Sequence, residues 1–196
     1  MFIDDARETV LTRVLLLTLA ATPLLAQDVW SRADSATVRA APSRFPALPA
    51  AVRADLERRG CRIPQSAETG APEPLHNVIS GAFTGKGGAD WAVLCSVHDT
   101  SQILVYRAAA AAAFDSLARA ADRNFLQTID GAGRIAYSRK LMGASAAYIR
   151  SHANAYNGPT PPSPLDHEGI DDGFQGKGSE IYYYFGGKWL KLQGAD

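Results

Sequence analysis

The sequence predicts an α+β fold, mainly an antiparallel β-sheet meander with one or two short helices and a C-terminal β-hairpin. Three observations support this fold class. Hydrophobic residues make up 46% of the 196 residues and charged residues 20%, which is typical of a globular chain. Two apolar runs of strand length, Trp91–Val97 and Ile103–Tyr106, are separated only by a short polar connection. Finally, the glycine pair Gly186–Gly187 separates IYYYF from KWLKL, as in a tight hairpin turn.

The N-terminus has the pattern of a secretory signal peptide. An apolar run, Val14–Ala26, follows Arg13 and ends in a small residue before the polar pair Gln27 and Asp28. This run is shorter than the roughly 20 residues that a membrane-spanning helix needs. We therefore predict that residues 1–26 are a signal peptide, that no permanent membrane anchor remains, and that the mature protein is secreted or periplasmic.

The mature chain is expected to consist of an arm and one domain. Residues 27–49 are rich in Ala, Ser, Arg and Pro without sustained periodicity, which indicates a loosely ordered N-terminal arm anchored by Phe45 and Leu48. Residues 50–196 are numerous enough to bury one ordinary core. They are therefore expected to form a single globular domain.

The domain is expected to begin with a short helix. Val52 and Leu56 share one helical face, Pro49 suits the first turn, and Gly60 suits the C-terminal cap. The pattern therefore predicts a helix over Ala50–Arg59.

Strands are expected from Val78 and Ile79 onward, where the hydrophobic period changes. Both faces of the next two runs, Trp91–Val97 and Ile103–Tyr106, are apolar. A strand that is apolar on both faces is typical of the centre of a sheet covered on both sides. We therefore expect these two runs to pair in the middle of the meander.

Two further segments are expected to be helical. Ala108–Ala121 is alanine-rich, and the spacing of Phe114, Leu117 and Ala121 favours a helix by propensity. The alternative is that this segment turns and returns as a strand. Ser145–Tyr156 places aromatic and histidine side chains four residues apart, which predicts a second short helix.

The C-terminal hairpin has a register that follows from its glycine turn. Strand residues on either side of a two-residue turn face each other in order. This rule predicts five cross-strand pairs: Phe185 with Lys188, Tyr184 with Trp189, Tyr183 with Leu190, Tyr182 with Lys191, and Ile181 with Leu192.

The two faces of this hairpin are expected to differ. The face with Ile181, Tyr183, Leu190 and Leu192 is apolar and is expected to be core. The opposite face carries the candidate binding residues Tyr182, Tyr184 and Trp189. It is either covered by another layer or exposed to stack on a sugar ring or a peptide. If it is exposed, truncation of Tyr182 costs much less stability than truncation of Tyr183.

The two cysteines of the chain, Cys61 and Cys95, are predicted to form a disulfide. An even number of cysteines in an exported protein most simply pairs in the oxidising compartment. Two buried free thiols are the alternative. No histidine lies at ligand spacing from these cysteines, so a zinc site is not expected.

The strongest polar cluster is the segment LDHEGIDDG, which is the candidate metal site. Hard cations prefer such oxygen ligands, but the residue order of an EF-hand calcium loop is absent, and zinc needs more than one nearby histidine. Three interpretations remain: a solvated acidic turn, a cation site, and acid/base catalysis. No cofactor is predicted, and calcium is the one ion considered. The candidate ligands are Asp166, His167, Glu168, Asp171 and Asp172.

The segment GAFTGKGGADWAVL, Gly81–Leu94, resembles the repeat of the FG-GAP family, with a faint echo at Phe174–Gly178. The resemblance implies a strand-turn-strand unit. Family members coordinate calcium through acidic residues in the turn, whereas the matching positions of this chain hold Ala82, Thr84 and Lys86 and leave only Asp90. Calcium binding is therefore not implied. A chance glycine-rich turn is the alternative interpretation.

Function classes are narrowed mainly by what the sequence lacks. Lys and Arg number 20, Asp and Glu also number 20, and neither kind is gathered into a stripe, so nucleic acid is not an expected partner. A complete phosphate-binding loop and a serine-hydrolase elbow are absent from the sequence. We therefore predict a non-catalytic binding or interaction module with an extracytoplasmic protein or a glycan as its partner. The alternative is an exported hydrolase that uses the acidic loop 166–172 with a distant histidine.

Overall fold

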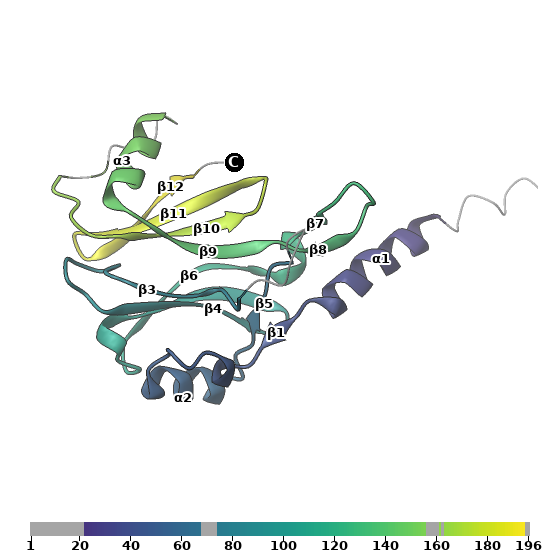
Figure 1. Ribbon diagram of the computed structural model, residues 1–196, viewed down its shortest axis with the longest axis horizontal. Coiled ribbons are helices and arrows are strands. Elements are labelled where there is room, and N and C mark those ends of the chain that lie inside the picture. Colours follow the sequence, from purple (N-terminus) through teal and green to yellow (C-terminus); the bar gives the residue numbers. More distant parts are fainter. Residues whose placement is uncertain (1–21, 68–73, 156–160, 162, 195–196) are drawn as a thin grey trace, which may run out of the picture.

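Two four-stranded antiparallel sheets form the centre of the computed structural model, which describes residues 22–67, 74–155, 161 and 163–194 (Figure 1). The first sheet has the order β3 (Val78–Gly81), β4 (Asp90–Val97), β5 (Thr100–Tyr106), β6 (Phe114–Ala121). The second sheet has the order β12 (Lys188–Gln193), β11 (Gly178–Phe185), β10 (Gly169–Phe174), β9 (Arg139–Ala144). Both are meanders of neighbouring strands, so the predicted α+β, mainly antiparallel fold class is confirmed.

Short elements complete the fold. Two strand pairs lie outside the main sheets: β1 (Arg39–Ala40) with β2 (Ile63–Pro64), and β7 (Leu126–Thr128) with β8 (Ile135–Tyr137). The α-helices are α1 (Thr22–Ala36), α2 (Ala50–Arg58) and α3 (Ala146–Ala155). Three 3₁₀ turns are η1 (Pro42–Arg44), η2 (Arg107–Ala109) and η3 (Asp122–Phe125).

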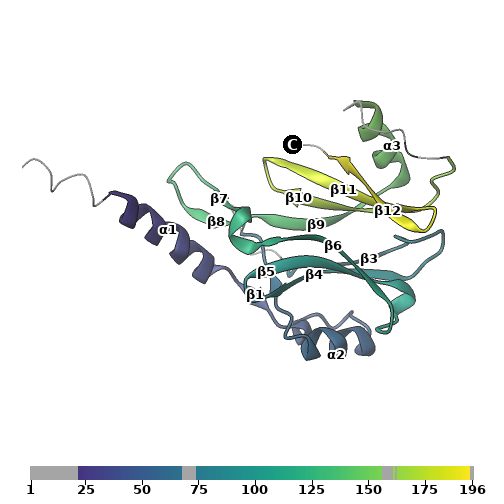
Figure 2. The same ribbon diagram turned by 180° about the vertical axis from the view of Figure 1, so that it is seen from behind.

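The layers follow the order α2, first sheet, second sheet, α3 (Figures 1 and 2). Each gap between layers holds its own hydrophobic core. Val93 and Leu104 face α2, whereas Leu94 and Ile103 face the second sheet. The third core, around Ile149, lies between α3 and the outer face of the second sheet. This arrangement confirms that β4 and β5 are central strands covered on both faces.

The predicted helix and disulfide near the start of the domain are confirmed together. Val52 and Leu56 of α2 are fully buried, and Gly60 closes the helix with φ of +70°. Cys61, directly after that glycine, forms a disulfide with Cys95 of β4, with their Cα atoms 5.3 Å apart. The bridge therefore fixes α2 to the central strand beneath it.

Loss of this disulfide is expected to lower the melting temperature by about 10 °C. The bridge closes a loop with a sequence separation of 34 residues, and the chain-entropy model gives about 3 to 4 kcal/mol for such a loop. Melting curves of the oxidised protein, the reduced protein and the Cys61→Ala/Cys95→Ala variant test this prediction. The reductant should leave the variant unaffected. Equal melting temperatures for oxidised and reduced protein would contradict it.

The C-terminal hairpin has the predicted register. Phe185 pairs with Lys188 across the turn, and the pairing continues to Ile181 with Leu192. Both turn glycines have positive φ, 58° for Gly186 and 83° for Gly187, which only glycine adopts without strain. The local turn chemistry thus sets the register of β11 and β12.

The expectation of a helix over Ala108–Ala121 is wrong, because most of this segment forms strand β6. Phe114 packs in the core beneath α2, whereas Leu117 packs in the core between the sheets. A helix would place these two side chains on one face, whereas a strand sends them to opposite faces. Pairing with β5, with a register shift between Ser101 and Ile103, therefore outweighs the helix propensity of the alanines.

The N-terminal arm also differs from expectation, because it contains the helix α1. Phe45 and Leu48 are buried as expected, but α1 projects from the body of the molecule (Figures 1 and 2). Its end is held by Arg39, whose guanidinium donates to the carboxylate of Asp34 at 2.6 Å and to Asp122 at 3.1 Å. The contact between Arg39 and Asp122 joins segments far apart in the chain, so local periodicity did not indicate it.

The predicted signal peptide lies largely outside the described residues, and it stays a prediction. Its expected end, Ala26, falls within α1. Within residues 22–67, 74–155, 161 and 163–194, no helix is both long and apolar enough to cross a membrane.

The two sheets meet along one side through the side chain of Asn77. Its amide donates to the carbonyl oxygen of Arg139 at 3.1 Å and accepts from the backbone nitrogen of Leu141 at 2.8 Å. The side chain therefore pairs with β9 as a backbone peptide group would. On the opposite side, Trp189 of β12 donates its indole N–H to Asp115 of β6 at 3.0 Å. On this side of the molecule a cleft lies between β6 and the second sheet.

Candidate functional site

A cleft of about 430 Å³, here called the inter-sheet cleft, lies between β6 and the second sheet. This volume is within the usual range for small-ligand pockets, about 300 to 1,000 Å³. The residues that line it come from both sheets, from η3 and from the β10–β11 turn. They are Ala118, Arg119, Ala120, Phe125, Arg139, Asp172, Phe174, Lys177, Gly178, Ser179, Glu180 and Gln193.

A buried ion pair forms one wall of the inter-sheet cleft. The guanidinium of Arg139 donates to both carboxylate oxygens of Asp172, at 2.7 Å each. It also donates to the Ser101 hydroxyl at 2.9 Å and to the Ala118 carbonyl oxygen at 2.8 Å, and both of these acceptors belong to the first sheet. Arg139 therefore ties the two sheets together, and this wall is rigid.

Two aromatic rings add an apolar surface to the cleft. Phe125 and Phe174 meet edge to face, with ring centroids 5.6 Å apart. The Arg139 guanidinium lies 4.3 Å from the Phe125 centroid, and the Lys177 ammonium lies 5.2 Å from the Phe174 centroid. Each ring thus has a cation over it.

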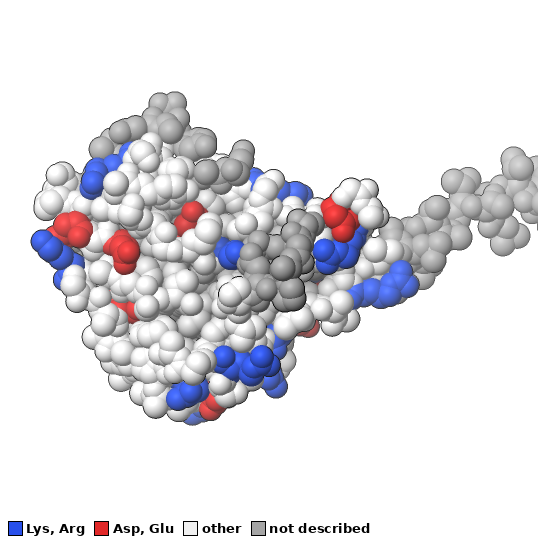
Figure 3. Space-filling model, in the orientation of Figure 1, with Lys and Arg blue, Asp and Glu red and all other residues white. Residues whose placement is uncertain are grey.

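Acidic and basic side chains are interspersed over the face of the molecule shown in Figure 3, but the charges around the inter-sheet cleft do not balance. Arg119 and Lys177 are exposed, and neither makes an ion pair with a described residue. By contrast, Asp172 is neutralised by Arg139, and Glu180 pairs with Lys191 at 2.5 Å. The cleft therefore carries an excess of positive charge and favours a ligand with a negative group.

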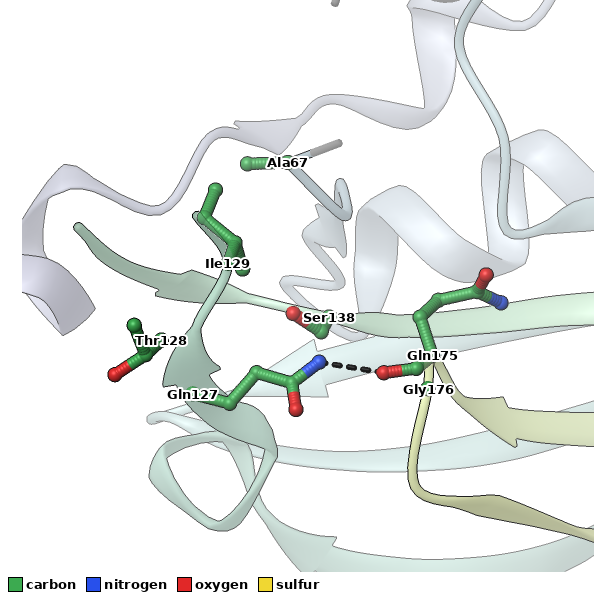
Figure 4. Close-up of a pocket in the computed structure, with 7 residues that line it drawn as sticks. All are labelled: Ala67, Gln127, Thr128, Ile129, Ser138, Gln175 and Gly176. Carbon is green, nitrogen blue, oxygen red and sulfur yellow. Dashed lines mark hydrogen bonds between the residues drawn. The ribbon is translucent and has the colours of Figure 1, made fainter. Parts of the chain in front are cut away.

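A second cleft, of about 340 Å³ and here called the polar cleft, lies at the other side of the β10–β11 turn (Figure 4). The side-chain amide of Gln127 donates to the Gln175 carbonyl oxygen at 2.5 Å and so bridges β7 and the β10–β11 turn. The lining residues are Ala67, Gln127, Thr128, Ile129, Ser138, Gln175 and Gly176, none of which is charged.

The candidate metal ligands of the acidic segment do not converge. Asp171 and Asp172 are neighbours on β10 and point to opposite faces of the second sheet, so one loop cannot use both. Glu168 accepts from the Ala82 backbone nitrogen at 2.9 Å, while His167 contacts Asp166 at 3.2 Å. Over the described part of the chain, no three His, Cys, Asp or Glu side chains form a group able to hold a metal ion.

Asp171 has the most perturbed environment of these acidic residues. It is 4% exposed, and burial raises the pKa of its carboxyl group. The Tyr148 hydroxyl donates to one oxygen at 3.3 Å, while the other oxygen has no hydrogen-bond partner among the described residues. The Tyr148 ring also lies 4.0 Å from that of His152, measured between centroids. The tyrosine thus contacts both the buried carboxyl group and the histidine.

The free energy of unfolding of the Asp171→Asn variant, relative to that of wild type, is expected to increase progressively as the pH rises above about 4. The pKa of Asp171 is higher in the folded than in the unfolded protein, so the protonated carboxyl group favours the folded state. This contribution to stability is fully present below the unfolded pKa and is lost as the pH rises through the folded pKa. The asparagine variant does not titrate, so its advantage over wild type should grow across that interval and then level off. Urea unfolding at pH 3.5, 5 and 7 tests this. A difference that is constant with pH would contradict it.

The aromatic face of the C-terminal hairpin is mostly buried, which differs from an exposed surface. Tyr182 is 8% exposed and belongs to the core between the sheets, and its hydroxyl donates to Glu180. Tyr184 and Trp189 are half-buried and meet edge to face at 5.4 Å. Trp189 packs against the core between the sheets, and the Arg107 guanidinium lies 4.7 Å from the Tyr184 ring centroid. Of the three, Tyr182 comes near a described cleft, since its partner Glu180 lines the inter-sheet cleft.

The segment that resembles an FG-GAP repeat forms the hairpin β3–β4, with its aspartate holding the turn. The carboxylate of Asp90 accepts from the backbone nitrogen and the hydroxyl of Thr84, at 2.8 Å each, and from the Ala108 nitrogen at 2.9 Å. The echo at Phe174–Gly178 occupies the corresponding hairpin, β10–β11. The family resemblance itself stays a prediction.

Most residues of the inter-sheet cleft were not singled out from the sequence. Lys177 was part of the FQGKG echo, and Asp172 was a candidate metal ligand. Arg119, Phe125 and Arg139 carried no local signal, because their roles depend on contacts between the two sheets.

Comparison with known proteins found no matching family model, no matching curated protein and no matching solved structure.

Proposed function

We propose that this protein is a non-catalytic binding module outside the cytoplasm, and that its inter-sheet cleft binds an acidic group of a protein or glycan partner. The observation that carries the proposal is that two exposed cations line the cleft, Arg119 and Lys177, and that neither makes an ion pair with a described residue. Lys177 also lies over the ring of Phe174. The disulfide and the predicted signal peptide support the compartment.

Several features of the inter-sheet cleft favour ligand binding over catalysis. Its wall is a hydrogen-bond network around Arg139, and the carboxylates of Asp172 and Glu180 are already paired with cations. A rigid wall orients a ligand, and the exposed cations of the lining attract a ligand of opposite charge. The ligand expected from this chemistry carries a carboxylate or another anionic group next to an apolar face.

Binding of benzoate and of the neutral isostere benzamide tests the proposal. Benzoate is expected to shift the amide NMR signals of residues around the cleft, and benzamide to bind more weakly. The Arg119→Gln and Lys177→Gln variants should each weaken benzoate binding by about two- to fivefold, the range for exposed charge pairs. Added salt should weaken it as well.

The matched control is Lys188→Gln, which removes an exposed lysine at the hairpin turn away from the cleft. This variant should bind benzoate as wild type does. Equal affinity for benzoate and benzamide, or equal effects of the Lys177 and Lys188 substitutions, would overturn the proposal.

The second candidate function is an exported hydrolase that uses the acidic segment with a histidine. The buried carboxyl group of Asp171 favours it, because Tyr148 contacts both Asp171 and His152. A hydrolase of this kind should cleave p-nitrophenyl esters or glycosides and lose that activity in Asp171→Asn. Hydrolysis by wild type that the substitution leaves unchanged would contradict a role for this carboxyl group.

A further inference from the structure

The polar cleft differs from the inter-sheet cleft in chemistry, although the two flank the same β10–β11 turn. We propose that the polar cleft is a separate carbohydrate-binding site that takes a neutral sugar ring. This inference does not depend on the acidic ligand proposed for the inter-sheet cleft.

The uncharged lining of the polar cleft favours a neutral ligand. None of the seven described residues that line the polar cleft is ionisable. The adjacent β7–β8 turn carries Asp130 and Arg134, which pair with each other at 3.1 Å. An ionic ligand would lose hydration there without gaining an opposite charge. The site is therefore suited to a neutral ligand.

The polar groups of the cleft match hydroxyl groups. Within the described residues, the Gln175 amide and the Thr128 hydroxyl make no hydrogen bond. The Ser138 side chain is 1% exposed, and its hydroxyl has only a long contact, 3.4 Å, with the Ala136 carbonyl oxygen. Amide and hydroxyl groups both donate and accept, as do the hydroxyls of a sugar. A sugar ring can therefore satisfy these groups in several orientations of its hydroxyls.

The framework of the cleft is preformed. The Gln175 nitrogen donates to the Ser138 carbonyl oxygen at 3.0 Å, and the Ser138 nitrogen donates to the Phe125 carbonyl oxygen at 2.9 Å. The Ala67 nitrogen donates to the Tyr137 carbonyl oxygen at 2.8 Å. These bonds fix the segments that carry the lining side chains, which lowers the ordering cost of binding a small ligand.

The shape of the lining also favours a ring over an extended peptide. In Figure 4, Ile129 and Ala67 form an apolar side of the cleft, and Ser138 and Gln127 lie below them. A sugar ring has an apolar C–H face and a polar rim, which suits such a two-sided cleft. Recognition of a peptide strand uses consecutive backbone groups along a sheet edge. The residues that line the polar cleft instead come from four separate segments of the chain.

Titration of the full chain with methyl β-glucopyranoside, methyl β-galactopyranoside and methyl β-N-acetylglucosaminide, followed by amide NMR shifts, tests the inference. At least one glycoside is expected to bind at millimolar concentration and to shift signals of Gln127, Thr128 and Gln175. Thr128→Val and Gln175→Ala, which alter a side chain without a hydrogen bond in the fold, should each weaken binding about fivefold.

The matched control is Gln193→Ala, which removes the same amide from the inter-sheet cleft and should leave glycoside affinity unchanged. Three results would overturn the inference: no shift with any glycoside, shifts that both polar-cleft variants leave unchanged, or binding of an N-acetylated tripeptide amide in place of the glycosides at these residues. Lys177→Gln separates the two sites, because it should weaken benzoate binding and not glycoside binding.

Discussion

Replacing Arg139 by methionine is expected to lower the free energy of unfolding by about 3 to 5 kcal/mol. The side chain is fully buried, and its guanidinium is the ion-pair partner of Asp172 at 2.7 Å. Without it, the Asp172 carboxylate stays buried with no opposite charge, and the Ser101 hydroxyl and the Ala118 carbonyl oxygen lose a donor. Urea unfolding of wild type and variant measures the loss.

Two further variants separate charge from packing. The double variant Arg139→Met/Asp172→Leu removes both charges, so it should recover most of the stability that the single variant loses. Arg134→Met breaks the exposed pair with Asp130 and should cost about 1 kcal/mol or less. A double variant as unstable as the single one would show that the buried charge is not the cause. Equal losses of unfolding free energy for Arg134→Met and Arg139→Met would also show that the buried charge is not the cause.

Elements whose contacts are local could be predicted from the sequence. The C-terminal hairpin is the clearest example, because its turn at Gly186–Gly187 and its alternating pattern lie within one short segment. The helix over Ala50–Arg58 likewise carries its own cap and apolar face. In both, local propensity and tertiary packing favour the same structure.

Elements decided by distant partners could not be predicted. The alanines of Ala108–Ala121 favour a helix locally, but the neighbouring strand β5 offers hydrogen bonds and apolar faces that only a strand can use. The end of α1 depends on Arg39, which reaches the carboxylate of Asp122 from another part of the chain. Neither contact leaves a periodic signal in the sequence.

The same distinction applies to the candidate sites. Arg139 and Asp172 are 33 residues apart and meet only because β9 and β10 are neighbours. The acidic segment was conspicuous as a sequence cluster, but the alternation of side chains along β10 separates Asp171 from Asp172. Closeness in sequence therefore did not bring these two carboxylates to one face, whereas both clefts arise from the packing of separate elements.

Truncation of either neighbouring tyrosine in β11 is expected to destabilise the protein by about 3 to 5 kcal/mol, as for other large aromatic side chains in a core. Tyr183 is 1% exposed and lies in the core beneath α3, while Tyr182 is 8% exposed and lies in the core between the sheets. The strand is therefore buried on both faces. Tyr182→Ala should cost about as much as Tyr183→Ala, whereas an exposed aromatic face would make it much less costly.

Conservative and exposed variants of the same hairpin provide the controls. Tyr182→Phe keeps the ring and loses only the hydrogen bond to Glu180, so it should cost about 1 kcal/mol. Lys188→Ala changes an exposed position of the turn and should be within about 0.5 kcal/mol of wild type. Unfolding in urea measures all four variants. A loss below about 1 kcal/mol for Tyr182→Ala would show that solvent reaches this face, and the hairpin aromatics would again be a candidate binding surface.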